Sequence, residues 1–432
     1  MSLNHIRKPI LIIGAGIAGL SLARTLAAHS IPAIVFDDAS ETRRQGFGVT
    51  LRSWGYDSLL KRAGVTAQDF QETVATDAAV GGHGYISTTV HDVYTGTDLI
   101  KMAHRPGAQM VTQEFFRANR FRLREFLMKG RVNERSPIDV RFQHVFEGYE
   151  VLSDKKGVVA KFANGERVEG SILVAADGVH STVRKLVLPQ ILPSVLHSVT
   201  FNGIINLPRK EFDTTSLGTM MEKNNVYIGM GDLFNISLAV NDQTDSEVEL
   251  SWSYSRPIKS LLDPESDTLY ERNAEDPNMI KEAFFDEIAT FQPSLASPFA
   301  EIFASESIRK TVRYQWVMRS IRCSREDLIE TAWQRSGLVV LIGDAAHAMP
   351  IFAGEGGNHG LLDGVQLGDL IAEHSKNQDE GMNVAIQTFY DGALERWSDA
   401  LDGSEKRLNG LNQPIQTWRK MAAAKAAVSE EK

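Results

Sequence analysis

Two glycine-rich turns, near opposite ends of this 432-residue chain, contain the residue types best suited to holding a charged ligand. The first has the spacing GxGxxG and consists of Gly14, Gly16 and Gly19. The second, GEGGN at 354–358, follows a Gly343-Asp344 pair and Pro350. Backbone N–H groups at the start of a helix lack intrahelical partners and attract anions and electron-rich oxygens. Both turns therefore predict binding of a ligand with negatively charged groups.

The elements around the first turn indicate a dinucleotide. Ile10 to Ile13 form the apolar run of a buried parallel strand, and a helix follows through about His29. The second strand, Ala33 to Phe36, ends at Asp37, whose carboxylate can accept hydrogen bonds from a ribose. A chance glycine turn is the alternative, but the strand, helix and acid together argue against it. NAD, NADP and FAD remain equally compatible with this unit.

A second acidic turn follows another buried strand, at Ser171 to Ala175. Asp177 and Gly178 come next, close to His180 and Ser181. A Ser-His-Asp catalytic set is rejected because residues so close in sequence rarely reach that geometry and no GxSxG elbow is present. Capping of a helix by Asp177 or Ser181 is the structural alternative to a ligand contact.

Between these motifs, residues 46–64 predict a glycine-rich strand, which includes Gly48, and a helix ending near Gly64. A later helix is predicted to contain Arg117 and Arg120, whose basic face is either solvated or placed near a pyrophosphate.

The middle of the chain predicts an antiparallel sheet followed by a helix. The expected strands are 199–206, 225–231, 234–240 and 248–254. The helix carries Ile280, Phe284, Ile288 and Phe291 on one face, and 311–321 is a further strand. Aromatic residues here favour a pocket for an aromatic or polycyclic substrate, with ordinary core packing as the equal alternative.

Composition excludes several classes of protein. With 43% hydrophobic residues the chain can bury a large core and is expected to form two domains. A formal charge of −9 argues against a nucleic-acid partner. The single cysteine, Cys323, fits a reducing compartment. No run is apolar enough for a membrane span, and the start MSLNHIRKP does not read as a secretory signal. A soluble, cytoplasmic protein is expected.

Three motifs together resemble the fingerprints of a known family. GAGIAGL at 14–20, AADGVHSTVR at 175–184 and GDAAHAMPIFAGEGGN at 343–358 are similar, in order and spacing, to those of the single-component (class A) FAD-dependent monooxygenases of the p-hydroxybenzoate hydroxylase type. The resemblance covers residues 9 to about 185 and 311 to 380.

This resemblance implies an α/β fold: a Rossmann-like FAD-binding domain with an inserted antiparallel-sheet substrate domain and C-terminal helices. The FAD domain is expected at 1–75, 106–190 and 311–380. The substrate domain is expected at 76–105 and 191–310, and a C-terminal helical segment at 381–432.

The resemblance also implies which residues contact FAD. Asp37 stands where the family usually has Glu, and the helix after the second turn faces the pyrimidine oxygens of the flavin. The implied FAD contacts are Gly14, Gly16, Gly19, Asp37, Gly48, Arg120, Asp177, Gly178, Gly343, Asp344, Pro350, Gly354, Gly356, Gly357 and Asn358.

The implied reaction is insertion of one oxygen atom from O2 into an electron-rich small molecule through a flavin C4a-hydroperoxide, with NADPH or NADH as transient reductant. The alternatives are an NAD(P)-dependent dehydrogenase, another FAD oxidoreductase such as an oxidase, and a non-catalytic flavin-binding protein. A monomer or homodimer is expected, without a metal.

Candidates for contact with the substrate are Tyr227, Arg52 and Arg319. Some relatives place an Arg on the first middle strand and a Tyr on the next to orient a phenolate. Here the first position is Asn202, and Tyr227 stands at the second. His347 is interpreted as a loop or core histidine. Gly360, Gly364 and Gly368, spaced four apart, predict close packing of their helix.

Overall fold

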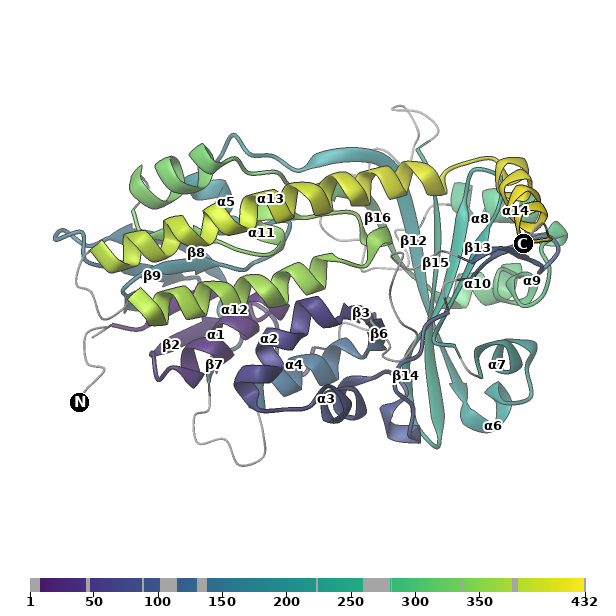
Figure 1. Ribbon diagram of the computed structural model, residues 1–432, viewed down its shortest axis with the longest axis horizontal. Helices are drawn as coiled ribbons and strands as arrows, with labels where there is room; N and C mark the ends of the chain where they lie inside the picture. Colours follow the sequence, from purple (N-terminus) through teal and green to yellow (C-terminus); the bar gives the residue numbers. More distant parts are fainter. Residues whose placement is uncertain are drawn as a thin grey trace.

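The chain is described by a computed structural model, shown in Figure 1. The residues described are 8–43, 47–87, 89–101, 115–129, 138–222, 224–258, 280, 282–335, 337–374 and 380–430. The predicted domain boundary between 105 and 106 lies outside these residues.

A five-stranded parallel sheet forms the centre of one half of the molecule (Figure 1). Its strands, in spatial order, are β17 (Val339–Leu341), β11 (Leu173–Ala175), β1 (Ile10–Ile13), β2 (Ala33–Phe36) and β7 (Asp139–Arg141). The predicted strands at 10–13 and 33–36 are therefore confirmed. All four residues of β1 are buried, because helices and loops cover both faces of a parallel sheet. The carboxyl ends of β1, β11 and β17 meet at one edge.

Helices α1 (Ile17–Ala28) and α12 (Gly356–His374) pack against each other beside this sheet. Small residues make the close approach possible. A Cβ atom added to Gly364 would lie 2.5 Å from the Leu22 backbone nitrogen, and one on Gly368 would lie 2.7 Å from Thr25. The predicted close packing of the glycine face of α12 is thus confirmed.

Smaller elements surround this unit. The pair β3 (Val49–Arg52) and β6 (Phe115–Ala118) forms a two-stranded ribbon, so Arg117 lies on a strand and not on the predicted helix. The predicted helix wrongly included Arg117, because the arginine-rich segment continues from the strand into α4 with no glycine or proline between them. The remaining nearby elements are α2 (Ser53–Ala63), α3 (Ala67–Val74), η1 (Ala78–Val80), α4 (Arg120–Lys129), β8 (Phe146–Val151), β9 (Val158–Phe162), β10 (Arg167–Gly170), α5 (Thr182–Val187), η5 (Glu326–Arg335), α11 (Asp344–His347) and η6 (Ile351–Ala353).

A seven-stranded sheet dominates the other half (Figure 1). Its order is β16 (Val312–Ser320), β12 (Ser194–Pro208), β15 (Glu247–Pro257), β14 (Asn235–Gln243), β13 (Val226–Met230), β4 (Thr89–Asp92) and β5 (Asp98–Lys101). The four predicted middle strands are confirmed. The strand from 312 pairs with β12, so it belongs to this sheet rather than to the parallel one.

The two faces of the large sheet differ. One face carries a core that includes Phe201, Trp252 and Tyr254 and packs on short helices. These are α6 (Arg209–Phe212), α7 (Ser216–Met221), α8 (Glu282–Phe291), η4 (Gln292–Ser294), α9 (Phe299–Ile302) and α10 (Ser305–Thr311). The other face carries Ile228 and Met230, which cluster with Phe352 from the loop before α12. This second face is called the loop face below.

Two C-terminal helices connect the halves. The helix α13 (Glu380–Leu411) runs beside α12 toward the large sheet, where α14 (Ile415–Glu430) packs on β5 (Figure 1). Together these elements make the predicted α/β fold class correct.

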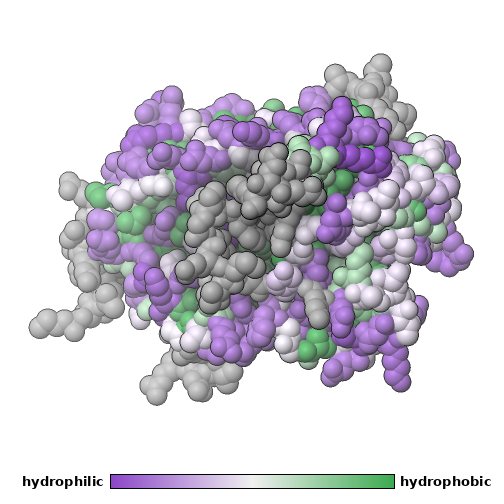
Figure 2. Space-filling view, turned by 45° about the vertical axis from the view of Figure 1, so that its right-hand side comes forward, coloured by the Kyte–Doolittle hydropathy of each residue, from purple (hydrophilic) through white to green (hydrophobic). Residues whose placement is uncertain are grey.

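In the view of Figure 2, hydrophilic side chains predominate and hydrophobic ones are scattered among them. Among the described helices, none combines the length and apolar character that crossing a membrane requires.

Candidate functional site

The first glycine turn has no room for side chains. Gly14 has φ +108°, a conformation that favours glycine, and an added Cβ would collide with the Ala176 carbonyl. A Cβ on Gly19 would collide with the carbonyl of Gly14, so Gly19 allows the helix to approach the strand. At Gly16 the nearest atom to an added Cβ is 3.9 Å away, which leaves the backbone open to a ligand. This is the arrangement expected for a pyrophosphate site.

Asp37 braces this turn from the end of β2. Its Oδ2 accepts a hydrogen bond from the Ala15 N–H at 2.7 Å, and its Oδ1 accepts one from the Ala39 N–H at 3.0 Å. Each carboxylate oxygen has a further lone pair, so these bonds leave acceptor capacity for a ribose. The short Asp side chain therefore supports the loop in addition to its predicted role.

The second turn lies directly against the first. A Cβ on Gly357 would lie 3.5 Å from Ile17, and one on Gly360 would lie 3.4 Å from Ala18. A Cβ on Gly356 would lie 3.8 Å from the Asp344 carboxylate. Segments more than three hundred positions apart in the sequence are thus in contact.

Asn358 connects the start of α12 to β3. Its Oδ1 accepts from the Arg52 backbone N–H at 2.7 Å, and its Nδ2 donates to the Thr50 carbonyl at 2.9 Å and the Gly354 carbonyl at 3.0 Å. The residue is fully buried. Its side chain therefore positions the loop 354–358, and Gly354 ends the preceding turn with φ +64°. Pro350 precedes this turn.

Asp344 lies three residues after the end of β17, beside the second glycine turn. It starts α11 after Gly343, which has φ +59°. The side chain is exposed although its neighbours are buried, so it faces a recess. Surrounding protein atoms still raise the pKa of Asp344 by desolvation, and the charges of His347 and Arg120 partly offset the rise.

The guanidinium group of Arg120 interacts electrostatically with the Asp344 carboxylate. Burial lowers the pKa of Arg120, and the charge of Asp344 opposes that shift. Its Nε has no hydrogen-bond partner among the described residues. A buried guanidinium N–H without an acceptor is costly and is expected to be satisfied by an anionic ligand.

Two residues near these motifs were missed by the sequence analysis. Arg124, one turn after Arg120, donates from Nε to the Ala15 carbonyl at 3.2 Å. Its i+4 spacing from Arg120 was the available signal. Asp363 lies fully buried under the Gly343 turn and accepts a hydrogen bond from the Gly343 N–H at 3.0 Å. A single acid in an apolar helix face gives no sequence signal for such a contact.

Asp177 and Ser181 both act at the start of α5. Asp177 Oδ2 accepts from the N–H groups of Thr182 at 2.8 Å and Val183 at 3.2 Å, and Ser181 Oγ accepts from the Arg184 N–H at 2.9 Å. Asp177 and Ser181 therefore cap the start of α5, which is the structural role considered for them from the sequence. Burial raises the pKa of Asp177, and its Oδ1 has no partner among the described residues. Gly178 has φ +80° and is open on its Cβ side.

Gly48 brings the ribbon close to the large sheet. Its N–H donates to Asn241 Oδ1 at 3.1 Å, and an added Cβ would lie 2.7 Å from Arg117 Nε. Burial lowers the pKa of Arg117 to about 10. Gly48 therefore connects the start of the ribbon to β14 of the large sheet.

Three aromatic residues meet there. The Phe47 ring stands edge-on to Tyr314 at 5.7 Å and to Trp316 at 5.9 Å, measured between ring centroids. Tyr314 is paired with Asn202 across β16 and β12, and paired residues share a face of the sheet. Asn202 is buried, and its Oδ1 has no partner among the described residues.

Arg52 lies beside the second glycine turn, whereas Tyr227 and Arg319 lie on the helix-covered face of the large sheet. Arg52 packs over Phe115 and donates from Nη2 to the Ala353 carbonyl at 3.4 Å. Tyr227 alternates with Ile228 and Met230, so it occupies the helix-covered face, and burial raises its pKa to about 12. Arg319 pairs with Val195, which packs on the same helix-covered core.

The residues present fit FAD. The backbone at Gly16 is open, Arg120 Nε has no hydrogen-bond partner among the described residues, and the Asp344 side chain is exposed. The start of α12, beside Asp344, adds backbone N–H groups of the kind that lack intrahelical partners and attract anions.

The model of the FAD binding domain matches residues 7–227 and 302–388. The FAD-dependent monooxygenase aptC of Emericella nidulans is 36% identical over 420 residues, covering 96% of this chain and 98% of the relative. The FAD-dependent monooxygenase adaC of Aspergillus niger is 37% identical over 427 residues, covering 98% of each.

Solved structures share the fold at lower identity. The 2,6-dihydroxypyridine-3-hydroxylase of Arthrobacter nicotinovorans superposes with a TM-score of 0.72 at 18% identity, covering 94% of this chain and 93% of that one. Klebsiella pneumoniae HpxO, complexed with FAD and uric acid, superposes with a TM-score of 0.68 at 19% identity, covering 98% and 95%.

Proposed function

Because this chain belongs to the FAD-binding-domain family and is an FAD-dependent monooxygenase, we propose that its substrate is an aromatic or polycyclic small molecule and that NADPH or NADH supplies the electrons. Bound FAD, once reduced, activates O2 and supplies the oxygen atom that enters the substrate. The alternative of an NAD(P)-dependent dehydrogenase is set aside, because it would leave the FAD family match unexplained.

The aromatic group at the loop face carries the substrate proposal. The Phe47 ring makes edge-on contacts with Tyr314 and Trp316 of the large sheet, next to Gly48, which is itself hydrogen-bonded to that sheet. Such a group provides flat apolar walls, which suit an aromatic ring better than a flexible polar chain. One structural neighbour is named for a dihydroxypyridine and another is complexed with uric acid; both compounds are flat heteroaromatic rings, which supports the same class of substrate.

We assign the diphosphate and ribose of FAD to one group of residues. The backbone at Gly16, with Gly14 and Gly19 shaping the turn, receives the diphosphate, and Arg120 Nε donates to it. Asp37 accepts from the adenosine ribose through its remaining lone pairs. Asp177, Gly178, Gly343 and Asp344 line the middle of the cofactor.

The flavin ring is assigned to the second turn. Gly48, Pro350, Gly354, Gly356, Gly357 and Asn358 surround it in the proposal. The first N–H groups of α12 stabilise negative charge on the pyrimidine side of the ring, where charge increases on reduction. Asn358 contributes by holding this turn against Thr50 and the Arg52 backbone, which keeps the N–H groups directed at the ring.

Arg52 is the one sequence-derived candidate that we retain for the substrate side. It approaches the ring loop through Ala353 and lies 4.0 Å from Glu355. Tyr227 and Arg319 are left out of the proposal because they occupy the other face of the large sheet. No base is assigned, so the chain's contribution is orientation of the substrate and retention of the cofactor.

We also propose the domain limits derived from the sequence, with the strand from 312 transferred to the substrate sheet because it pairs with β12. A monomer or homodimer in the cytoplasm is proposed as well. Light scattering of the purified chain after size-exclusion chromatography tests the assembly state.

The function is tested with the purified, FAD-loaded protein. NADPH and NADH oxidation is measured with a panel of phenols, indoles and aromatic polyketides, and products formed under labelled O2 are weighed by mass spectrometry. We expect at least one substrate to accelerate NAD(P)H oxidation and to gain one labelled oxygen atom. Acceleration only by non-aromatic compounds, or product without labelled oxygen, would contradict the proposal.

A further inference from the structure

Glu355 immediately precedes helix α12, in the second glycine turn, which we assign to the flavin ring. Its backbone carbonyl accepts hydrogen bonds from the N–H groups of Asn358 at 2.9 Å and His359 at 3.0 Å, so Glu355 occupies the N-capping position of this helix. The N–H groups of Gly356 and Gly357 have no acceptor among the described residues. The start of α12 is therefore open to a ligand.

The Glu355 carboxylate lies against two side chains from other parts of the site. Its Oε1 lies 4.0 Å from Arg52 Nη2, at the end of β3, and its Oε2 lies 3.9 Å from His359 Nε2, on the first turn of α12. At these distances the contacts are electrostatic and are not hydrogen bonds. A carboxylate beside a helix start is also attracted to the first N–H groups of that helix. Arg52 and His359 therefore compete with those N–H groups for the carboxylate.

Helix α13 holds His359 in one protonation state. The His359 Nδ1 atom lies 2.7 Å from Arg396 Nη1. Because an arginine can only donate, Nδ1 is the acceptor and the ring proton is on Nε2, the nitrogen that faces Glu355. Burial lowers the pKa of His359 and the charge of Arg396 adds to this effect, so the ring is neutral at pH 7. His359 thus presents an N–H dipole to the carboxylate.

Glu355 itself is ionised at neutral pH. His359 does most to lower the pKa of Glu355. The charges of Arg52 and of Arg407, an exposed residue of α13, act in the same direction, against the effect of burial. The Glu355 side chain is 30% exposed, and the charge of a partly buried group is screened less than that of a fully solvated one. A negative charge is therefore fixed at the second glycine turn.

A fixed negative charge beside the flavin opposes the negative charge that the ring gains on reduction. It acts against the first N–H groups of α12, which favour that charge. We propose that Glu355 tunes the cofactor: its carboxylate, placed by Arg52 and by the positioning residue His359, lowers the reduction potential of bound FAD. A lower potential makes the reduced cofactor a stronger electron donor toward O2. This inference rests on the proposed placement of the flavin ring at 354–358.

The test measures the reduction potential of FAD bound to the full-length chain, by spectrophotometric titration against a reference dye. Glu355→Gln removes the charge and keeps the shape of the side chain. We expect the preference for reduced over oxidised FAD to increase about tenfold, which is an upward shift of about 30 mV for this two-electron couple. Glu355→Asp keeps the charge and should remain closer to the natural potential than Glu355→Gln does.

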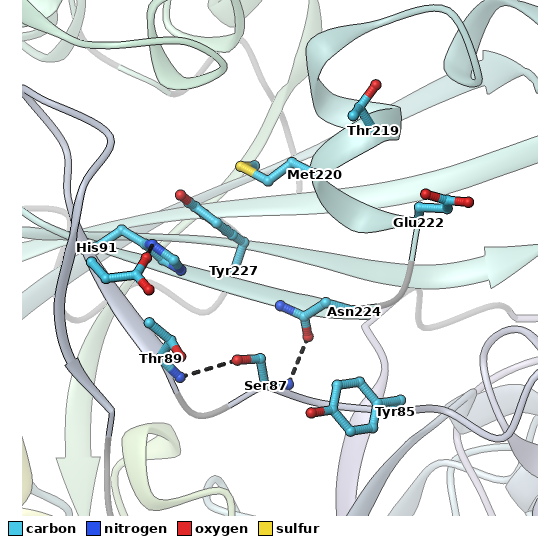
Figure 3. Close-up of a pocket in the computed structure, with 10 residues that line it drawn as sticks. Tyr85, Ser87, Thr89, His91, Thr219, Met220, Glu222, Asn224 and Tyr227 are labelled. Atoms are coloured by element: carbon cyan, nitrogen blue, oxygen red, sulfur yellow. Dashed lines mark hydrogen bonds and ion pairs between the residues drawn. The ribbon is translucent and has the colours of Figure 1, made fainter.

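The matched control is Glu222→Gln. Glu222 directly follows α7 and lines a recess together with His91 and Tyr227, on the helix-covered face of the large sheet (Figure 3). This substitution removes the same charge from an exposed position away from the second glycine turn. It should leave the potential unchanged.

His359→Gln tests whether His359 acts through Glu355. Loss of the imidazole releases the carboxylate toward the open N–H groups of α12, where it competes with FAD. FAD binding, measured by fluorescence titration, should weaken about threefold to tenfold in His359→Gln. The same substitution made in Glu355→Gln should change binding little, because the effects of coupled residues do not add. Equal losses in both backgrounds would overturn the placement of Glu355 by His359.

An unchanged or lowered potential in Glu355→Gln would overturn the proposal. An equal shift in Glu222→Gln or in Glu355→Asp would do so as well, because the effect would then not depend on a charge at this turn. Failure of the proposed function is a separate result, in which the natural chain binds no FAD or its FAD is not reduced by NADPH or NADH. An upward shift confined to Glu355→Gln establishes the tuning role.

Discussion

The Nε2 atom of His347 lies 2.6 Å from the Oδ2 atom of Asp363, and both side chains are buried. The other partners of this carboxylate are also donors: the Gly343 N–H at 3.0 Å, Arg396 Nη2 at 2.8 Å and Trp397 Nε1 at 2.9 Å. A carboxylate can accept from all four, whereas an amide would turn its own N–H groups toward donors. Asp363 therefore joins the turn at Gly343 to helix α13.

Replacement of Asp363 by Asn is expected to weaken FAD binding at least tenfold and to lower stability by about 3–5 kcal/mol, because it leaves buried donors and a buried charge uncompensated. Burial alone would raise the pKa of Asp363, but His347 and Arg396 outweigh burial and hold it below its ordinary value. Fluorescence titration with FAD and thermal unfolding with and without FAD measure both effects.

The matched control is Asp369→Asn. Asp369 lies on the same helix and pairs with Arg62 at the surface. That variant should lose less than about 1 kcal/mol, as is usual for an exposed ion pair. If Asp363→Asn gained the same stabilisation from FAD as the natural chain, the proposed link between this carboxylate and the cofactor turn would be wrong.

Gly364→Ala should destabilise the protein by roughly 1–3 kcal/mol, because a Cβ atom there would lie 2.5 Å from the Leu22 backbone nitrogen and force α12 away from α1. The displacement also moves the second glycine turn, so FAD affinity should fall. Chemical denaturation and FAD titration check the two outcomes.

The control for this change is Gly392→Ala on α13. Nothing lies within 4 Å of a Cβ added at Gly392, so the gain in helix propensity should raise stability by about 0.5–1 kcal/mol. Equal effects of the two alanines would show that helix packing at Gly364 is looser than described.

Cys323 is expected to resist thiol reagents in the folded protein. The side chain is buried, and burial raises the pKa of the Cys323 thiol to about 12 despite the nearby charge of Arg184. Since the thiolate is the reactive form, modification by a disulfide reagent at pH 8 should be on the order of a hundredfold slower than in denaturant. Fast modification of the native protein would show that Cys323 is accessible.

His91 should make the protein sensitive to acid. Burial lowers the pKa of folded His91, with Asp98 opposing the shift, so below about pH 6.5 the unfolded chain binds a proton that the folded chain does not. Stability therefore falls as pH drops through this window, down to the folded pKa. His91→Gln should show a smaller loss between pH 7 and pH 5 in denaturant titrations.

The exposed His83 provides the comparison for that experiment. His83→Gln removes a histidine of the same type from an exposed position and should retain the natural dependence of stability on pH. An unchanged slope in His91→Gln would mean that another group causes the loss of stability in acid.

The sequence by itself determined the parts of this protein that local pattern encodes. Apolar runs such as Ile10 to Ile13 identify buried strands, and the glycines at 14, 16 and 19 identify a turn that only small residues permit. Three such motifs in order identified the family and the α/β class, since each motif carries its own backbone constraint.

The tertiary structure alone decided which side chains meet at the site. The sequence predicted the strand that contains Tyr227 correctly. Successive side chains of a strand point to opposite faces of the sheet, and the pairing with neighbouring strands decides which face lies toward the glycine turns. Asp363 gained its role only when α12 was packed beneath Gly343. Contacts between distant segments depend on packing, which local sequence patterns do not record.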